Sequence, residues 1–250
     1  MSIHNNPSYD QERELLRKEL GTFSGAFLAG GALTSVFTGE KVNDYDLYFR
    51  SHKDFARAVQ EAYEEYNHWC VSLTRRAITF KSHDTVYQFM FFRFFETPEE
   101  IFKSFDFTCC MAALDAEEGG DFHLHPRFLV DASQRKLVFN HETDFPIASA
   151  VRIMKYQERG YTITRSEWLK VLAACVFRDV KDWGDLEDQI GGHYGDIVAS
   201  FAKDKDKPFT LESVVAALER RDLASNRGEE EPPTNYEDAI KRISAIRRLE

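Results

Sequence analysis

The sequence has 250 residues, 43% hydrophobic and 30% charged, which is enough chain for one large domain or two small ones. Its 42 acidic residues outnumber its 32 Lys and Arg residues, and the net charge of −10 excludes a uniformly basic nucleic-acid-binding protein but allows a local basic groove. No apolar run approaches the roughly 18 residues of a membrane-spanning helix, and the four cysteines lack CxxC spacing, so we expect a cytoplasmic protein without membrane contact.

The first fifty residues alternate between helix and strand patterns. Tyr9–Leu20 has the apolar spacing of an amphipathic helix, and the short apolar run Ala26–Ala29 predicts a strand. A pair of glycines follows that run, and Ala32–Phe37 then predicts a short helix. In residues 44–49, the side chains of Tyr45, Leu47 and Phe49 alternate with those of Asp44, Asp46 and Tyr48, which predicts a second strand.

The next segment predicts a helix, a hairpin and a second helix. Phe55–Tyr66 carries an apolar stripe at helical spacing. Arg76–Lys81 and Thr85–Phe92 are rich in strand-forming residues and flank a short polar turn, so we expect a β-hairpin. The run Thr97–Glu100 combines a capping residue, a proline and a glutamate in the order that starts a helix.

From about Ile147 onward the pattern is mostly helical. The expected helices cover Trp168–Phe177 after a Thr164/Glu167 capping box, then Leu211–Leu223 and Tyr236–Leu249, with a solvated linker at Gly228–Thr234. We therefore predict an α+β fold. A mixed, mostly antiparallel sheet with flanking helices would occupy residues 1–145, and an α-helical domain would occupy residues 146–250.

Aromatic residues make up 14% of the chain, with 21 Phe, and many of the Phe residues gather between Phe89 and Phe107. Such a cluster builds either a core or a platform on which bases stack. Because the cluster follows predicted strands and a helix, we expect it to pack between the sheet and its helices. Phe105, next to Asp106, is kept as a candidate functional residue.

The most informative pattern is Gly30-Gly31 followed, after twelve residues, by Asp44-Tyr45-Asp46. Residues two apart on a strand share a face, so Asp44 and Asp46 would place two carboxylates together. Such a pair is costly unless a cation lies between them, and carboxylate oxygens suit Mg²⁺ or Mn²⁺. Backbone amides of a glycine turn at a helix start can approach a phosphate closely. The combination indicates phosphoryl or nucleotidyl transfer.

These residues resemble the nucleotidyltransferase superfamily of DNA polymerase beta, poly(A) polymerases and CCA-adding enzymes. The motif segments are Leu28-Ala29-Gly30-Gly31, Asp44-Tyr45-Asp46-Leu47, Phe105-Asp106-Phe107-Thr108 and Ser149-Ala150-Val151-Arg152. The chain is most similar to the CCA-adding head domain, and it also resembles compact phage-type nucleotidyltransferase-like proteins. The resemblance covers roughly residues 20–165 and implies a metal-dependent transfer of a nucleoside monophosphate from an NTP to a hydroxyl group.

The resemblance also implies a role for each candidate residue. Asp44 and Asp46 would bind two Mg²⁺ or Mn²⁺ ions. Gly30, Gly31 and Thr34 would hold the triphosphate. Arg152 and Lys155, on one face of a predicted helix, would contact phosphates of the NTP or of an RNA acceptor such as a tRNA-like 3′ end. Alternatively, Arg152 and Lys155 belong to an ordinary solvent-exposed helix face without a binding role.

A third carboxylate is expected on a strand next to the Asp pair, and the sequence leaves two positions open. Asp106 is the candidate by residue type, whereas the spacing of the motifs points to the strand Val86–Phe92, which offers Gln88. Glutamine can bind a cation weakly but cannot act as a base. A catalytically inactive nucleotide- or nucleic-acid-binding relative is therefore the first alternative, and an interaction protein that merely keeps the fold is the second.

Overall fold

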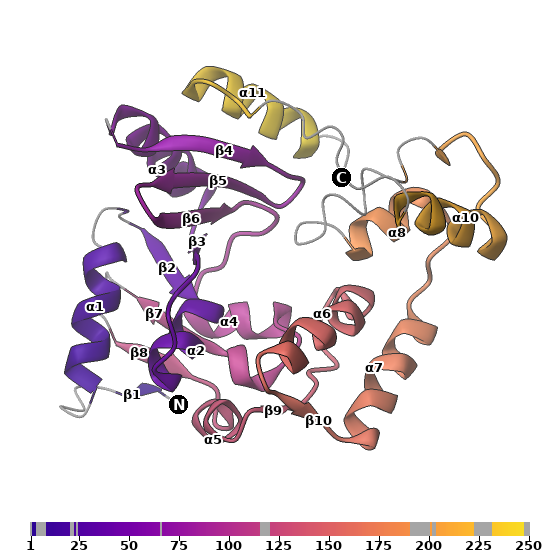
Figure 1. The fold of residues 1–250 in the computed structure, drawn as a ribbon. Coiled ribbons are helices and arrows are strands. Elements are labelled where there is room, and N and C mark those ends of the chain that lie inside the picture. Colours follow the sequence, from indigo (N-terminus) through magenta and orange to yellow (C-terminus); the bar gives the residue numbers. More distant parts are fainter. Residues whose placement is uncertain are drawn as a thin grey trace.

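The computed structural model describes residues 2–3, 9–20, 23, 25–65, 67–115, 121–190, 201, 204–222 and 232–247. Figure 1 shows a sheet with helices on both sides and a helical part that follows it in the chain. Within the described residues, no helix combines the length and the apolar character that crossing a membrane requires.

The strands of the large sheet are β1 Ser2–Ile3, β2 Ala26–Ala29, β3 Tyr45–Phe49, β4 Trp69–Leu73, β5 Ala77–Ser82, β6 Thr85–Met90, β7 Ala112–Asp115 and β8 Phe122–Leu124. The helices that accompany it are α1 Asp10–Leu20, α2 Gly31–Thr38, α3 His52–Glu64, α4 Pro98–Ile101, α5 Phe128–Ser133 and the short 3-10 turns η2 Phe102–Ser104 and η3 Thr108–Cys110. The later elements are β9 Lys136–Leu137, α6 Pro146–Glu158, β10 Thr162–Ile163, α7 Arg165–Phe177, α8 Trp183–Ile190, α10 Leu211–Asp222 and α11 Tyr236–Arg247.

The eight strands lie in the order β1-β8-β7-β2-β3-β6-β5-β4. β3 and β6 run parallel, and every other neighbouring pair in this sheet is antiparallel. The predicted mixed, mostly antiparallel sheet is confirmed. The parallel pair places Asp46 opposite Gln88.

Alternation along the strands divides the core between the two faces of the sheet. On β3, Leu47 and Phe49 join the larger core, which α1, α2, α3 and α5 cover, whereas Tyr48 joins a smaller core on the opposite face. Phe95, Phe102 and Phe105 fill that smaller core. The expectation that the Phe cluster packs between sheet and helices is confirmed. Since Asp46 is two residues before Tyr48, it lies on the same face as the smaller core.

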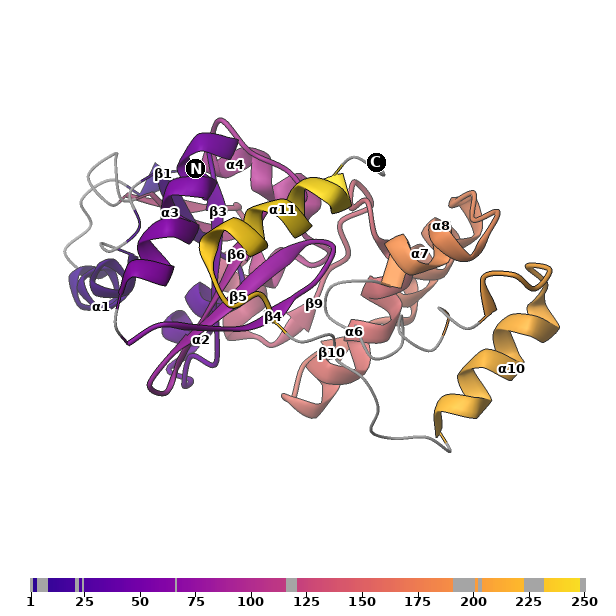
Figure 2. The same ribbon diagram turned by 90° about the horizontal axis from the view of Figure 1, so that it is seen from above.

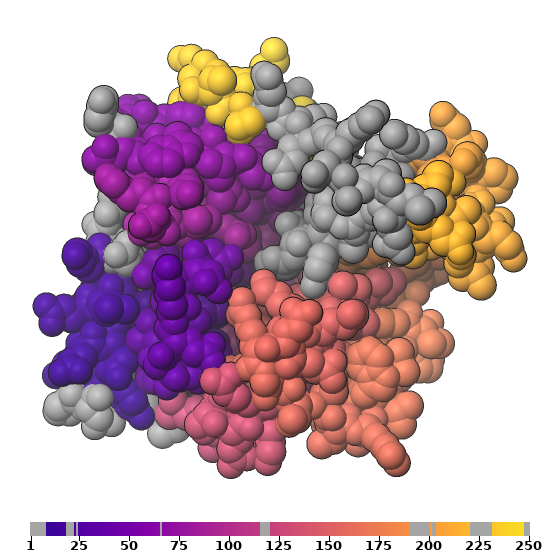
Figure 3. Space-filling view, viewed as in Figure 1, coloured from indigo at the N-terminus to yellow at the C-terminus, as the bar shows by residue number. Residues whose placement is uncertain are grey.

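The helical part has a small core of its own, formed by Trp183, Leu186, Ile190, Phe201 and Ala217. Figure 3 shows α6 and α7 adjoining the N-terminal elements on one face of the molecule. The last described helix, α11, returns to the sheet, where it lies along α3 in both ribbon views (Figures 1 and 2). Its Ala239 and Ile243 are buried in the larger core. The division into residues 1–145 and 146–250 stays a prediction.

Several predicted boundaries need correction. The helix expected at Phe55–Tyr66 begins at His52, because Ser51 caps it and accepts a hydrogen bond from the Asp54 amide at 3.2 Å. The expected capping box at Thr97 is incomplete, since Thr97 makes no side-chain cap and Glu100 instead accepts from the Glu96 amide. β4 carried no clear alternation and was not predicted. Most of the linker Gly228–Thr234 lies outside the described residues.

Candidate functional site

Two carboxylates meet at the start of β3. Asp44 is the last residue before the strand, and Asp46 is its second residue. Gln88 on the neighbouring β6 donates from Nε2 to Asp44 Oδ2 at 2.9 Å. The register of the two parallel strands brings Gln88 to this place, so Gln88 rather than Asp106 stands opposite Asp46 in the sheet.

The surroundings of Asp46 disfavour its ionised form. Burial raises the pKa of its carboxyl group from the ordinary 3.8 to about 7, and the charge of Asp44 adds to the rise. Arg152 and Lys155 oppose this shift. The Oδ1 atom of Asp46 is buried and has no hydrogen-bond partner among the described residues. A buried, unpaired carboxylate oxygen next to a second carboxylate is the environment that a cation would relieve.

The glycine pair lies directly against this carboxylate. Gly30 precedes α2 with φ 84°, a conformation that favours glycine. A Cβ atom built on Gly30 would lie 3.8 Å from Asp46 Oδ2 and 3.5 Å from the ring of Phe105. A Cβ atom on Gly31 would meet nothing within 4 Å, so the first turn of α2 has open space beside it. The first backbone N–H groups of a helix lack intrahelical partners, and they suit an anion such as a phosphate.

Thr34, the other residue predicted to hold the triphosphate, is buried in α2. Its hydroxyl lies 2.9 Å from the carbonyl oxygen of Cys109, to which it donates. This bond ties the glycine turn to the segment that follows Phe105 and Asp106. The Thr34 hydroxyl is therefore directed at the backbone of Cys109, behind the glycine turn.

Asp106 forms an ion pair with Arg152, with Oδ2 3.3 Å from Nη1. Arg152 also donates from Nη2 to the Tyr156 hydroxyl at 3.2 Å. The other carboxylate oxygen of Asp106 is buried and unpaired among the described residues. Asn140 fixes the backbone of this segment. Its backbone N–H donates to the Asp106 carbonyl at 2.7 Å, and its side-chain Nδ2 donates to the Phe105 carbonyl at 2.8 Å. Asp106 thus orients the guanidinium group of Arg152.

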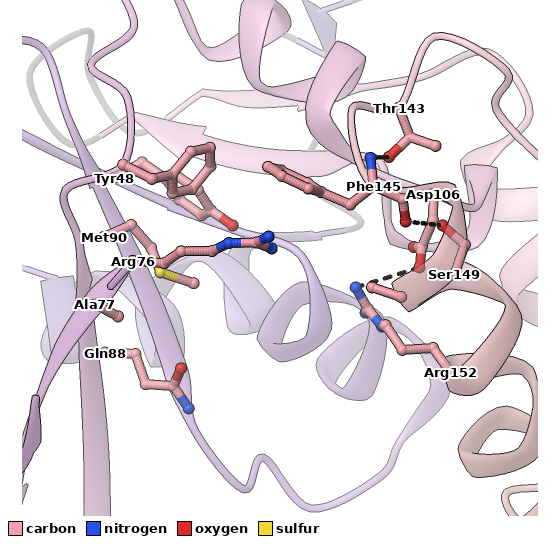
Figure 4. Close-up of a pocket in the computed structure, with 12 residues that line it drawn as sticks. Tyr48, Arg76, Ala77, Gln88, Met90, Asp106, Thr143, Phe145, Ser149 and Arg152 are labelled. Carbon is pink, nitrogen blue, oxygen red and sulfur yellow. Dashed lines mark hydrogen bonds and ion pairs between the residues drawn. The ribbon is translucent and has the colours of Figure 1, made fainter. Parts of the chain in front are cut away.

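A pocket with an empty volume of about 570 Å³, open mouth included, lies between the sheet and α6. Its lining residues are Tyr48, Arg76, Ala77, Gln88, Met90, Phe92, Asp106, Thr143, Phe145, Ala148, Ser149 and Arg152. Figure 4 shows the Arg76 side chain reaching across it towards Phe145. The guanidinium carbon of Arg76 lies 3.6 Å from the centre of the Phe145 ring. Flat, partly charged walls of this kind suit a heteroaromatic ring.

Lys155 lies one turn beyond Arg152 on α6. Its side chain contributes to the field at Asp46. Partial desolvation of the ammonium group, together with Arg159 and Arg152, lowers the pKa of Lys155, and Asp44 and Asp46 oppose that shift. The structure therefore gathers Asp44, Asp46, Gly30, Arg152 and Lys155 around one site.

Sequence reasoning missed part of the pocket wall. Tyr48 could have been found, because it follows Asp46 by two residues on the same strand and faces the same side. Arg76 and Phe145 carried no such signal, since they are far apart in the chain and meet only through the tertiary fold.

The residues present fit a hard divalent cation. The donor set is the two carboxylates of Asp44 and Asp46, and the Oδ1 atom of Asp46 is buried without a partner in the described part of the chain. Gln88 presents its amide nitrogen to Asp44. Among the described residues, no cluster of three or more His, Cys, Asp and Glu side chains forms a metal site.

The fold is similar to that of CCA-adding enzymes. The structure of a CCA-adding enzyme in apo form I matches with a TM-score of 0.53 and 12% identity, covering 87% of this chain and 52% of that chain. The complex of a CCA-adding enzyme with ATP matches with a TM-score of 0.51 and 12% identity, covering 96% of this chain and 52% of that chain. At these identities the likeness establishes the nucleotidyltransferase-like fold with its helical C-terminal part.

At the level of sequence, Gabija anti-defense 2 of Bacillus phage SPbetaL7 is 37% identical over 213 residues, which is 85% of this chain and 52% of that protein. The chain thus spans about half the length of this curated relative. The family model described as Gabija anti-defense 2 family protein matches residues 5–135, just over half of the chain. The chain therefore belongs to the Gabija anti-defense 2 family.

Proposed function

We propose that the chain is a metal-dependent nucleotidyltransferase that moves a nucleoside monophosphate from an NTP to a hydroxyl group. The observation that carries this proposal is the pairing of Asp44 and Asp46, with the unpaired Oδ1 of Asp46, beside the glycine turn Gly30-Gly31. Carboxylates that bind a cation and amides that bind phosphates are the two components that polyphosphate chemistry requires.

Asp44 and Asp46 would hold Mg²⁺ or Mn²⁺. When bound, such a cation would neutralise charge on the triphosphate and lower the pKa of the attacking hydroxyl group. The amides at the start of α2 would bind phosphate oxygens, and Lys155 and Arg152 would add positive charge on the opposite side. The pocket between Tyr48 and Phe145 would receive the flat ring of the nucleotide.

An RNA 3′ end is the acceptor that we propose to test first, because the sequence motifs resemble the CCA-adding head. Arg152 and Lys155 on α6, together with Arg159 directly after its C-terminal end, would supply the positive charge that binds a phosphate backbone. Total tRNA is incubated with each α-³²P-labelled NTP and Mg²⁺. Periodate-oxidised tRNA, which lacks an intact 3′ terminal diol, serves as the matched acceptor control.

We expect label on intact tRNA and none on oxidised tRNA. Asp44→Asn and Asp46→Asn should each reduce transfer at least about a hundredfold, because losing a cation ligand removes several kcal/mol of transition-state stabilisation. Asp84→Asn is the control, since Asp84 is an exposed carboxylate in the β5–β6 turn. Transfer that survives in Asp46→Asn would refute this assignment of the site.

One observation favours a second candidate, a nucleotide-binding relative that does not transfer. β6 presents the amide of Gln88, not a carboxylate, to the Asp pair, and an amide cannot accept the proton of the attacking hydroxyl. This candidate predicts Mg²⁺-dependent stabilisation by NTPs without label transfer to any acceptor.

The family description suggests a biological setting. We propose that the chain helps a phage to counter the bacterial Gabija defence. The test compares phage plaques on bacteria that carry Gabija and express either the chain or its Asp46→Asn variant. If the chain restores plaques and the Asp46→Asn variant does not, the Asp44–Asp46 site takes part in this role. If both forms restore plaques, the role does not require the site.

A further inference from the structure

The helix α7 carries apolar side chains on two sides. On the inner side, Val171 is buried in the larger core, and Ala174 and Cys175 pack against that core. The outer side exposes five large apolar side chains, which we call the α7 stripe. They belong to Trp168, Leu169, Leu172, Val176 and Phe177. A helix that is apolar on all sides is normally buried on all sides, so the outer side of α7 has the composition of a contact surface.

A second exposed apolar stripe lies on α10. Ala217 of this helix is buried in the small core of the helical part, whereas Leu211, Val215 and Leu218 are exposed. These three residues recur at helical spacing and share one face, which we call the α10 stripe. The two stripes together hold most of the large apolar side chains that are exposed in the described part of the chain.

The charges beside the two stripes have opposite signs. Exposed Arg165 and Arg178 lie at the two ends of α7, and Lys170 in its middle pairs with Glu167. Exposed Glu212 and Glu219 accompany the α10 stripe. Two α7 stripes facing each other would bring like charges together, and so would two α10 stripes. An α7 stripe that faces an α10 stripe brings opposite charges together, so charge complementarity favours this pairing.

Both stripes belong to one end of the molecule. Figures 1 and 2 place α7 and α10 at the end opposite α1. A two-fold axis between the two helices would set α7 of one chain against α10 of its partner at two equivalent places, as in a closed symmetric dimer. A standard interface buries about 800 Å² on each partner, and side chains as exposed as Phe177, at 88%, and Val176, at 80%, offer an area of that order.

We propose that two copies of the chain form a two-fold dimer in which the α7 stripe of each copy packs on the α10 stripe of the other. In the described part of the chain, the stripes share no residue with the pocket between the sheet and α6. Each copy therefore keeps its own Asp44–Asp46 site, and dimerisation is tested separately from nucleotidyl transfer.

The test is sedimentation velocity of the full chain at concentrations up to about 100 µM, with the monomer mass of 29.0 kDa as the reference. Val176→Asp changes the α7 stripe, and Val215→Asp changes the α10 stripe. Val130→Asp is the matched control, because Val130 is exposed on α5, outside both stripes. Thermal unfolding of each variant shows whether it folds. The double variant Glu212→Lys/Glu219→Lys reverses the charges beside the α10 stripe and leaves every apolar side chain in place.

We expect the wild-type chain and Val130→Asp to form dimers. Val176→Asp and Val215→Asp should each weaken dimerisation at least about a hundredfold, because each dimer would bury two carboxylates against apolar side chains. The charge reversal should weaken it at least about threefold. Mixing the Val176→Asp and Val215→Asp chains should restore dimers in part, since one α7–α10 contact of the mixed dimer is then unaltered.

Four results would each overturn the proposal. The first is a wild-type chain that stays monomeric, and the second is a stripe variant that dimerises as well as Val130→Asp. The third is a charge reversal without effect. The fourth is a mixture of the two stripe variants that stays monomeric, because α7 would then pair with α7, or α10 with α10.

Discussion

The amide of Gln88 donates a hydrogen bond of 2.9 Å to the carboxylate of Asp44, across the parallel pair of strands in the large sheet. On one side, therefore, the Asp44–Asp46 pair is held by a neutral donor. On the other side, Arg152 and Lys155 supply positive charge. The protein itself thus compensates part of the negative charge of the Asp44–Asp46 pair.

In EDTA, the chain should lose stability as the pH rises towards 7. The pKa of Asp46 is about 7 in the folded chain, whereas an unfolded Asp has a pKa near 3.8. Between these values the folded state binds more protons than the unfolded state, so the free energy of unfolding falls as the pH increases and levels off above about 7. Urea unfolding in EDTA at several pH values measures this, and subtracting the Asp46→Asn curve isolates the residue. A difference between the two proteins that does not change with pH contradicts the prediction.

The two glycines should respond differently to alanine. Gly30→Ala forces a left-handed φ of 84° on a residue with a Cβ atom and places that atom against Phe105, so we expect a loss of about 1–3 kcal/mol in unfolding free energy. Gly31→Ala meets open space and should leave stability unchanged or slightly higher. Its methyl group nevertheless occupies the start of α2, so the affinity for NTP should fall. Urea unfolding and nucleotide titration of both variants check the contrast, and equal NTP affinity for wild type and Gly31→Ala would argue against a phosphate at this turn.

Asp106 should act as a positioning residue. Asp106→Asn removes the negative partner of Arg152 and should lower the unfolding free energy by about 1–3 kcal/mol. Because Arg152 then loses the charged partner that orients it, KM for the NTP should rise more than kcat falls. Steady-state kinetics and Mn²⁺ titration separate this role from direct cation binding. A loss of kcat with a matching loss of Mn²⁺ affinity would instead make Asp106 a cation ligand.

Much of the site could be predicted because it depends on local patterns. The alternation in residues 44–49 placed Asp46 on a defined face of its strand, and the glycine pair between a strand and a helix predicted the turn beside it. Both features depend on backbone geometry that neighbouring residues determine.

The rest depends on contacts between distant segments. Neither the register that sets Gln88 opposite Asp46 nor the ion pair of Asp106 with Arg152 has a local signature, so the position of a third carboxylate stayed open. The packing of α11 against α3 could not be predicted for the same reason. An amphipathic pattern shows that one helix face is apolar, but it does not show which surface covers that face.

The central claim is that Asp44 and Asp46 form a nucleotidyl-transfer site, and paired labelling of the NTP tests it most directly. The chain is incubated with tRNA, Mg²⁺ and an NTP labelled with ³²P at either the α or the γ phosphate. The account predicts that the α label moves to the RNA, that the γ label appears in pyrophosphate, and that Asp46→Asn abolishes both. Transfer of the γ label to the RNA, or α-label transfer that Asp46→Asn leaves intact, would contradict it.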